Sequence, residues 1–198
     1  ELLNMVNDAD FDLTKAADVI SRDTAMVLSL LEMVNKMTVN SKITSIRHAA
    51  AMLGQRELKK WINTAVTREL CADRPSEITR ISLLRAKFME QLAPMYGMAQ
   101  KSSELFLTGL FSVLDLILNM PMEEALKKVN VSKEIIDALV SQKGDLAPVY
   151  HLMLCYENAD WQEISRQMIM MNQSIHELAD IYISSLIWYK DLFFSGNV

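Results

Sequence analysis

The groups in this 198-residue sequence that could do chemistry are three histidines, two cysteines and a few polar residues inside an apolar segment. The histidines, at His48, His151 and His176, are too far apart in sequence to form a local metal-binding motif. Neither cysteine nor any serine lies in a nucleophile elbow such as G-x-S-x-G, and the five glycines form no phosphate-binding loop. Local motifs therefore predict no catalytic residue, no metal and no cofactor.

The apolar segment runs from Phe106 to Asn119 and reads FLTGLFSVLDLILN. A membrane-spanning helix needs about 20 uncharged residues, and this shorter segment carries Asp115, so we expect a buried core helix. Its polar residues recur every three or four positions and would share one helix face. They are Thr108, Ser112, Asp115 and Asn119, and Glu104, just before the segment, continues the same spacing. This face is either the solvent edge of the helix or a groove that binds a peptide or small ligand.

A second candidate surface is basic. Arg56, Lys59 and Lys60 are three and four residues apart, so on a helix they share a face that could receive an acidic partner or a phosphate group. Glu57 and Glu69 interleave with these cations, and an ordinary solvated helix face is the alternative interpretation.

The composition predicts an all-α protein. Apolar residues make up 51% and charged residues 23%, and only five glycines and four prolines interrupt them, which favours long helices. The helix start and stop signals along the chain predict a bundle of about eleven or twelve of them. We expect a single domain, with a helical core over residues 1–120 and a C-terminal helical part over 121–198. The net charge of −5 argues against nucleic-acid partners and membrane association. Two distant cysteines, Cys71 and Cys155, fit reduced thiols and a cytoplasmic location.

Helix ends can be predicted from capping and helix-breaking residues. Asp12 and Asp23 are suited to cap helices, Gly54 to end one, and Pro121 to separate two others. Ser132 is a further predicted cap. Asp160 with Glu163, and Ser174 with Glu177, match the capping-box spacing.

Methionine and aromatic residues concentrate near the C-terminus. The run MIMM at 168–171 fits either an adaptable binding surface or a core, and core packing is the more frequent use of methionine. Tyr182 and Trp188 belong to an aromatic set whose spacing of three and four also favours packing.

Three runs of the sequence are ISRDTAMVLSLLEMVNKM, ITSIRHAAAMLG and RELKKWI. Together they resemble the HDOD domain, an all-helical output module related to the HD metal-dependent phosphohydrolases. The resemblance extends over about residues 1–190. Two later runs, GLFSVLDLILNMPMEEALKKVNVSKEIIDALV and YENADWQEI, resemble the HDOD version that follows an EAL domain in bacterial signalling proteins. The resemblance implies a fragment of a longer EAL-HDOD protein in a bacterial cyclic-di-GMP network, for example one that controls motility or biofilm. It also implies protein partners, with an adjacent EAL domain as one candidate.

The namesake dyad of the HD family is missing. Relatives that retain it read like GLLHDIG, where the adjacent His and Asp would ligate a divalent metal, and the matching residues here are 109–115. Ser112 and Val113 occupy the dyad positions. Serine is a weak ligand and valine offers none, so the resemblance implies a degenerate site and a non-catalytic signalling module.

Two alternatives stay open. A divergent phosphohydrolase could draw ligands from His48, His151, His176 and Asp115. A nucleic-acid-binding helical domain could use the basic residues Arg56, Lys59, Lys60 and Arg68.

The sequence predicts the effect of two substitutions on stability. Gly109→Trp should overpack a close helix approach at a cost of a few kcal/mol. Ser112→Ala should change stability by less than about 0.5 kcal/mol if that side chain faces solvent or a groove.

Overall fold

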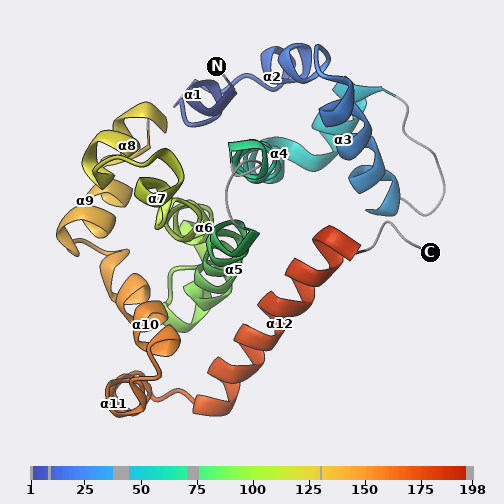
Figure 1. Cartoon of the computed structure of the whole chain (residues 1–198). Helices are drawn as coiled ribbons and strands as arrows, with labels where there is room; N and C mark the ends of the chain where they lie inside the picture. Colours follow the sequence, from blue (N-terminus) through green and yellow to red (C-terminus); the bar gives the residue numbers. More distant parts are fainter. Residues whose placement is uncertain (1, 9, 38–44, 71–75, 130, 195–198) are drawn as a thin grey trace. The chain divides into compact units, whose positions relative to one another are not determined.

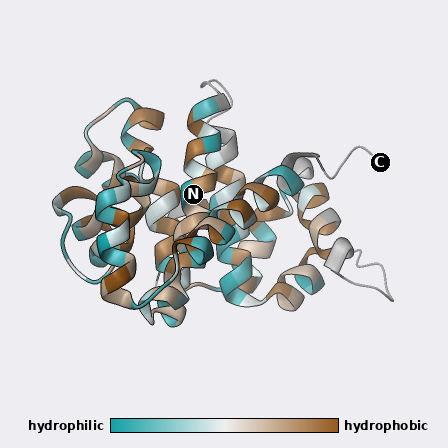
Figure 2. Cartoon of the chain, turned by 90° about the horizontal axis from the view of Figure 1, so that it is seen from below, coloured by the Kyte–Doolittle hydropathy of each residue, from teal (hydrophilic) through white to brown (hydrophobic). Residues whose placement is uncertain are grey.

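The computed structural model describes residues 2–8, 10–37, 45–70, 76–129 and 131–194. All regular structure in these ranges is helical, which confirms the all-α prediction. Figure 1 follows the helices from α1 to α12, and Figure 2 shows hydrophobic and hydrophilic residues mixed along them. Among the described residues, no helix combines the length and apolarity needed to cross a bilayer. Cys71 and Pro75 lie outside the described residues.

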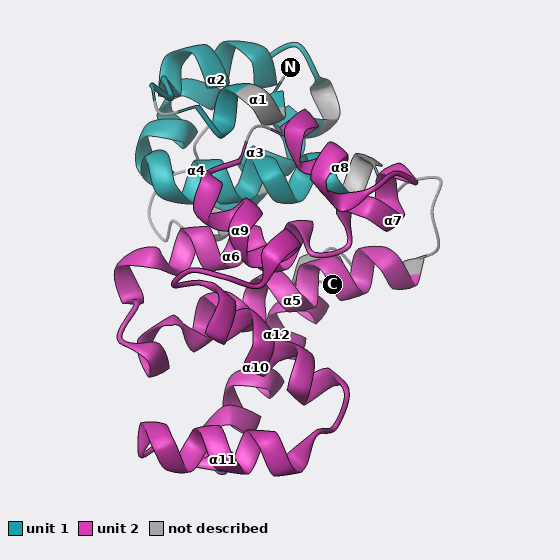
Figure 3. Cartoon of the chain, turned by 90° about the vertical axis from the view of Figure 1, so that its left-hand side faces the viewer, with its two compact units in different colours: residues 1–69 teal, residues 70–198 magenta. Residues whose placement is uncertain are grey.

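The chain divides into two compact units, residues 1–69 and residues 70–198, which Figure 3 distinguishes by colour. The division falls at the end of α4, whereas the sequence predicted a border between helical core and C-terminal part at residues 120–121. The first unit contains α1 (Leu2–Val6), α2 (Leu13–Ile20), α3 (Thr24–Met37) and α4 (Ile46–Leu70).

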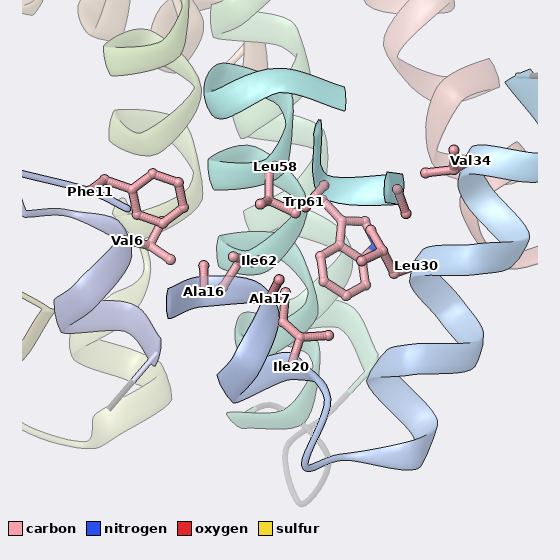
Figure 4. Packing of buried hydrophobic residues seen from close by; sticks show 12 residues of the cluster. Val6, Phe11, Ala16, Ala17, Ile20, Leu30, Val34, Leu58, Trp61 and Ile62 are labelled. Atoms are coloured by element: carbon pink, nitrogen blue, oxygen red, sulfur yellow. The ribbon is translucent and has the colours of Figure 1, made fainter. Parts of the chain in front are cut away.

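The core of the first unit comes from apolar residues that face inward from its helices, as Figure 4 shows. Ile20, Leu30 and Ile62 are completely buried there. Removing each such side chain from water stabilises the fold by about 2 kcal/mol. The caps are as predicted: the Asp12 carboxylate accepts from the Thr14 amide at 2.7 Å, and Asp23 from the Met26 amide at 3.0 Å. Gly54, with φ 73° and ψ 168°, kinks α4 where a helix end was expected.

The second unit is built around α5. Its elements are α5 (Ser76–Leu92), the 3₁₀ helices η1 (Ala93–Tyr96) and η2 (Ala99–Lys101), α6 (Ser102–Phe111), α7 (Leu114–Leu118), α8 (Met122–Val129), α9 (Lys133–Ser141), α10 (Ala147–Glu157), α11 (Trp161–Met171) and α12 (Ile175–Phe194). Helix α5 packs most extensively against α6, and α10 and α12 also pack on it.

The close contact between α5 and α6 depends on Gly109. A Cβ atom at this position would lie 2.6 Å from the backbone nitrogen of Ala86 and nearer still to the Arg85 carbonyl, distances that real Cβ atoms essentially never show. Gly109 therefore permits the approach of two backbones, as the sequence predicted for this residue.

Several helices of the second unit end in residues other than glycine with left-handed backbone conformation. Asn119, Gln142 and Asn172 end α7, α9 and α11, and Ala159 lies in the turn between α10 and α11; their φ angles are 51° to 55°. Ser132 has the backbone conformation of a cap, but its side chain makes no capping bond, contrary to expectation.

Aromatic rings join α5, α10 and α12. The Phe88 ring centroid lies 5.3 Å from those of both Tyr156 and Tyr182, and Trp188 meets Phe106 edge to face at 6.3 Å. The packing roles predicted for Tyr182 and Trp188 are confirmed. Trp161 contacts Tyr156 but remains largely exposed.

Candidate functional site

The predicted single helix across the dyad positions is interrupted at those positions. Helix α6 ends at Phe111 and α7 begins at Leu114. The Ser112 hydroxyl donates to the Gly109 carbonyl at 2.7 Å, and the Ser112 amide bonds the same oxygen at 3.3 Å. A serine that bonds its own backbone in this way competes with the helical pattern, and Val113 leaves it at φ −123°, ψ 19°.

The polar residues from Glu104 to Asn119 therefore do not share one face of a continuous helix, which corrects the sequence expectation. Thr108 is buried and its hydroxyl donates to the Glu104 carbonyl at 2.7 Å. Asp115 is half-buried in the first turn of α7, while Asn119 is exposed and ends that helix. Of this set, Ser112 alone bonds a side chain from another helix in the contacts described here.

That partner is Arg85 on α5. Its Nη1 donates to the Ser112 hydroxyl at 3.1 Å, while Nε and Nη2 donate to the two carboxylate oxygens of Glu157 at 2.9 and 2.7 Å. The side chains of Arg85 and Glu157 are only 15% and 30% exposed. This two-pronged geometry is the strongest form of an arginine–carboxylate bond. A guanidinium cation is thus fixed on the residue at the first dyad position.

The residues at this point do not fit a divalent metal. The Ser112 oxygen already serves Gly109 and Arg85, and Val113 is buried against Ile78, Ile81 and Ile117. A divalent cation beside the Arg85 guanidinium would also be repelled. Within the described ranges, no three histidine, cysteine or acidic side chains gather closely enough to hold a metal. Within the second unit, His151, His176 and Asp115 of the alternative ligand set form no such group.

Two cations of the predicted basic face are engaged inside the first unit. The Lys59 ammonium donates to the Asp8 carbonyl at 3.2 Å and lies 4.9 Å from the Phe11 ring centroid. Lys60 is mostly buried and pairs with Glu57 at 3.2 Å. Arg56 is exposed, and the side chain of Arg68 lies outside the described part of the chain.

A pocket of about 470 Å³ opens between the α9–α10 turn and α11. Gln167 organises its wall: the amide accepts from the Tyr96 hydroxyl at 3.1 Å and donates to Glu163 at 2.9 Å, and its nitrogen lies 3.1 Å from His151 Nδ1. Burial raises the pKa of Tyr96, so this hydroxyl stays a donor at neutral pH. The remaining lining residues are Gln142, Lys143, Gly144, Ala147, Pro148, Arg166, Met170 and Met171.

Comparison with known proteins decides the family. The pattern that defines the HDOD domain matches residues 1–144. The chain belongs to the HDOD family. This HDOD chain is 27% identical over 194 residues to the protein named cyclic di-GMP phosphodiesterase CdgJ from Vibrio cholerae, covering 97% of the chain and 45% of CdgJ. It is 28% identical over 197 residues to YuxH of Bacillus subtilis, described as uncharacterized, covering 97% of the chain and 47% of YuxH.

The HDOD chain thus spans about half the length of the curated relatives that it matches. No solved structure matches it. The resemblance to the HDOD family is thus confirmed. Arg85 and Glu157 were not predicted, because they are 27 and 45 residues from Ser112 and form no local motif with it. The available signal was that Arg85 has no acidic residue three or four positions away on its own helix.

Ser112→Ala is now expected to destabilise the HDOD chain by about 1.5 kcal/mol, because it removes a buried hydroxyl that bonds a carbonyl and a charged group. The condition under which the sequence predicted a change below 0.5 kcal/mol does not hold, since Ser112 is buried. Urea denaturation measures the difference. Ser141→Ala, at the exposed end of α9, is the control and should be neutral within about 0.5 kcal/mol.

Glu163 should make stability depend on pH in the acid range. Hydrogen bonds from Arg166, and then from Gln167, lower its pKa from 4.5 to about 2. Its stabilising effect is therefore complete above pH 4.5 and is lost as the pH falls toward 2. Melting temperatures measured between these pH values should fall less steeply for Glu163→Gln than for the wild type. Identical slopes would contradict this assignment.

At the N-terminus of α11 the predicted capping box is half realised. The Asp160 carboxylate accepts from the Glu163 amide at 3.1 Å. The Glu163 carboxylate turns instead to Arg166 and Gln167. The expected reciprocal bond is thus replaced by the bonds that shape the pocket wall.

Proposed function

We propose that this HDOD domain is a non-catalytic, cytoplasmic signalling module that works through protein contacts in a cyclic-di-GMP network. One observation carries the proposal: the Arg85 guanidinium is bonded to Ser112 at the first dyad position and held there by Glu157. The positively charged Arg85 side chain therefore lies at the position where the resemblance implies a metal ion in relatives that keep the His-Asp dyad.

The chemistry of phosphodiester hydrolysis explains why this matters. A metal in such a site polarises phosphate and lowers the pKa of a bound water. Arginine can attract a phosphate, but its guanidinium stays protonated and cannot bind and deprotonate water as a metal does. With valine at the second dyad position, no carboxylate is present there to serve as ligand or base.

The name of the relative CdgJ fits this proposal if hydrolysis resides elsewhere in that protein. The chain covers only 45% of CdgJ. We place the phosphodiesterase activity in the remaining part of such proteins, in an EAL domain, and assign the HDOD domain to passing on that domain's state.

The best surface for a protein partner lies on α11 beside the pocket. Ile169 and Met170 are 79% and 72% exposed, and Trp161 is exposed at the start of the same helix. Methionine and tryptophan are enriched where proteins bind partners, because methionine adapts its shape and tryptophan offers a large contact area.

Metal analysis and turnover test the non-catalytic assignment. The purified chain, dialysed against manganese, iron or zinc, should retain less than stoichiometric metal and should not hydrolyse cyclic di-GMP. Stoichiometric metal together with turnover that is lost on chelation would overturn the assignment and restore the phosphohydrolase alternative.

Titration calorimetry against a separately produced EAL domain tests the partner. We expect binding that Met170→Asp weakens at least tenfold, because it puts a charge into an apolar contact. Leu116→Asp is the matched control, since Leu116 is a similarly exposed apolar residue on α7. Absence of binding would contradict the choice of partner, and equal effects of the two variants would contradict the choice of surface.

A further inference from the structure

Helix α12 has two apolar faces, and α5 covers one of them. Leu178 and Ser185 are completely buried on the covered face. Ser185 donates to the Gln91 side chain at 2.7 Å, and the Tyr182 ring packs against Phe88. These contacts fix the orientation of α12, which runs as one uninterrupted helix in Figure 1.

The opposite face carries Ile183, Leu186 and Ile187, which are 53%, 37% and 55% exposed. Their spacing of three and four residues puts them on one stripe, turned away from Leu178 and Ser185 because a helix has 3.6 residues per turn. No described residue of the second unit covers this stripe. Three large aliphatic side chains side by side in water are typical of a contact surface.

Two charges frame the stripe symmetrically. Asp180 and Lys190 are exposed, and neither forms an ion pair among the described residues. Each is five residues from Ser185, while Ile183 and Ile187 are each two residues from it. The two isoleucines and the two charged residues are thus placed symmetrically about Ser185, and Leu186 adds apolar surface on one side, where its counterpart is Ser184.

We propose that this face binds a second copy of the chain, with the two α12 helices antiparallel around a two-fold axis. In that arrangement Ile183 of each copy meets Ile187 of the other. Each Asp180 then faces a Lys190 of the second copy, so both unpaired charges are satisfied in two identical ion pairs. A parallel pairing would instead place Asp180 against Asp180 and Lys190 against Lys190.

Such a contact is expected to be weak. A single helix pair buries less than the roughly 1,200 Å² that stable complexes usually bury, so the dimer should dissociate on dilution. Its exposed ion pairs should also weaken as salt screens them. Self-association should therefore depend on both protein and salt concentration.

Sedimentation velocity of the 198-residue chain, across a hundredfold concentration range, tests the proposal. We expect a monomer–dimer equilibrium at low salt, which Ile183→Asp abolishes and Leu116→Asp does not change. Asp180→Lys and Lys190→Asp should each weaken the dimer at least tenfold, and the double swap should restore it. Circular dichroism should show unchanged folding, because all substituted residues are exposed.

Three outcomes would overturn the proposal. A monomer at every concentration means that the occupant of the stripe is not a second copy. A dimer that Ile183→Asp leaves intact forms elsewhere. A dimer that Ile183→Asp breaks, but that the double swap does not restore, lacks the antiparallel register.

Discussion

Gly109→Ala is expected to destabilise the second unit by about 3 kcal/mol or more, although it adds only one methyl group. The methyl carbon would have to occupy space held by the Arg85 carbonyl and the Ala86 amide nitrogen, and these are backbone atoms of a packed helix. A flexible side chain could move aside, but the backbone of α5 cannot do so without parting from α6. Gly109→Trp, the variant suggested by the sequence, should be worse.

Urea unfolding followed by circular dichroism measures this effect. Gly144→Ala is the matched control, because a Cβ there meets nothing within 4 Å and suffers only from a φ of 83°. That control should cost about 1 kcal/mol. If Gly109→Ala costs no more than Gly144→Ala, the close backbone approach is not what requires glycine at position 109.

Arg85→Met should cost about 2 kcal/mol. It leaves the Glu157 carboxylate, whose side chain is 30% exposed, without its bidentate partner and the Ser112 oxygen without a charged donor. Breaking a fully buried pair costs about 3 to 5 kcal/mol, and the partial exposure of Glu157 reduces this figure. Methionine keeps most of the volume of the arginine stem, so the change tests the charge more than the packing.

A double-mutant cycle with Glu157→Gln isolates the interaction. We expect the losses in unfolding free energy to be less than additive by at least about 1 kcal/mol, because the second change removes a group whose partner the first change has already removed. Lys127→Met is the control: Lys127 pairs with Glu123 at 3.1 Å, both side chains are more than 60% exposed, and losing that pair should cost at most about 0.5 kcal/mol. If the stability losses of the two variants are additive, Arg85 and Glu157 do not stabilise the protein through their ion pair.

Features of the fold that depend on residues close together in sequence could be predicted from the sequence. Asp12 and Asp23 could be predicted as caps because a carboxylate directly before an apolar helix accepts hydrogen bonds from the first free amides of that helix. Gly54 was expected to end a helix, and it kinks α4 at that position. The family followed from runs that are continuous in sequence. These features share one property: all the atoms involved lie within a few residues of each other.

The contacts at Ser112 could not be read in this way. A serine between apolar residues looks the same in sequence whether it faces water or bonds a distant arginine, and the choice depends on how α5, α6 and α10 pack. The break between α6 and α7 was missed for a related reason. Nothing in LFSVLD forbids a helix, and the interruption comes from hydrogen bonds to Gly109 that the spacing pattern does not encode.

The left-handed residues at the helix ends bear on how robust the protein is to heat. Gln142 and Ala159 hold φ angles of 51° and 55°, a conformation that costs an ordinary residue about 1 kcal/mol more than glycine. Asn119 and Asn172 carry a smaller penalty of the same kind. Each of these residues therefore leaves the second unit less resistant to heat than glycine at the same position would, as expected of a protein that natural selection keeps only moderately stable.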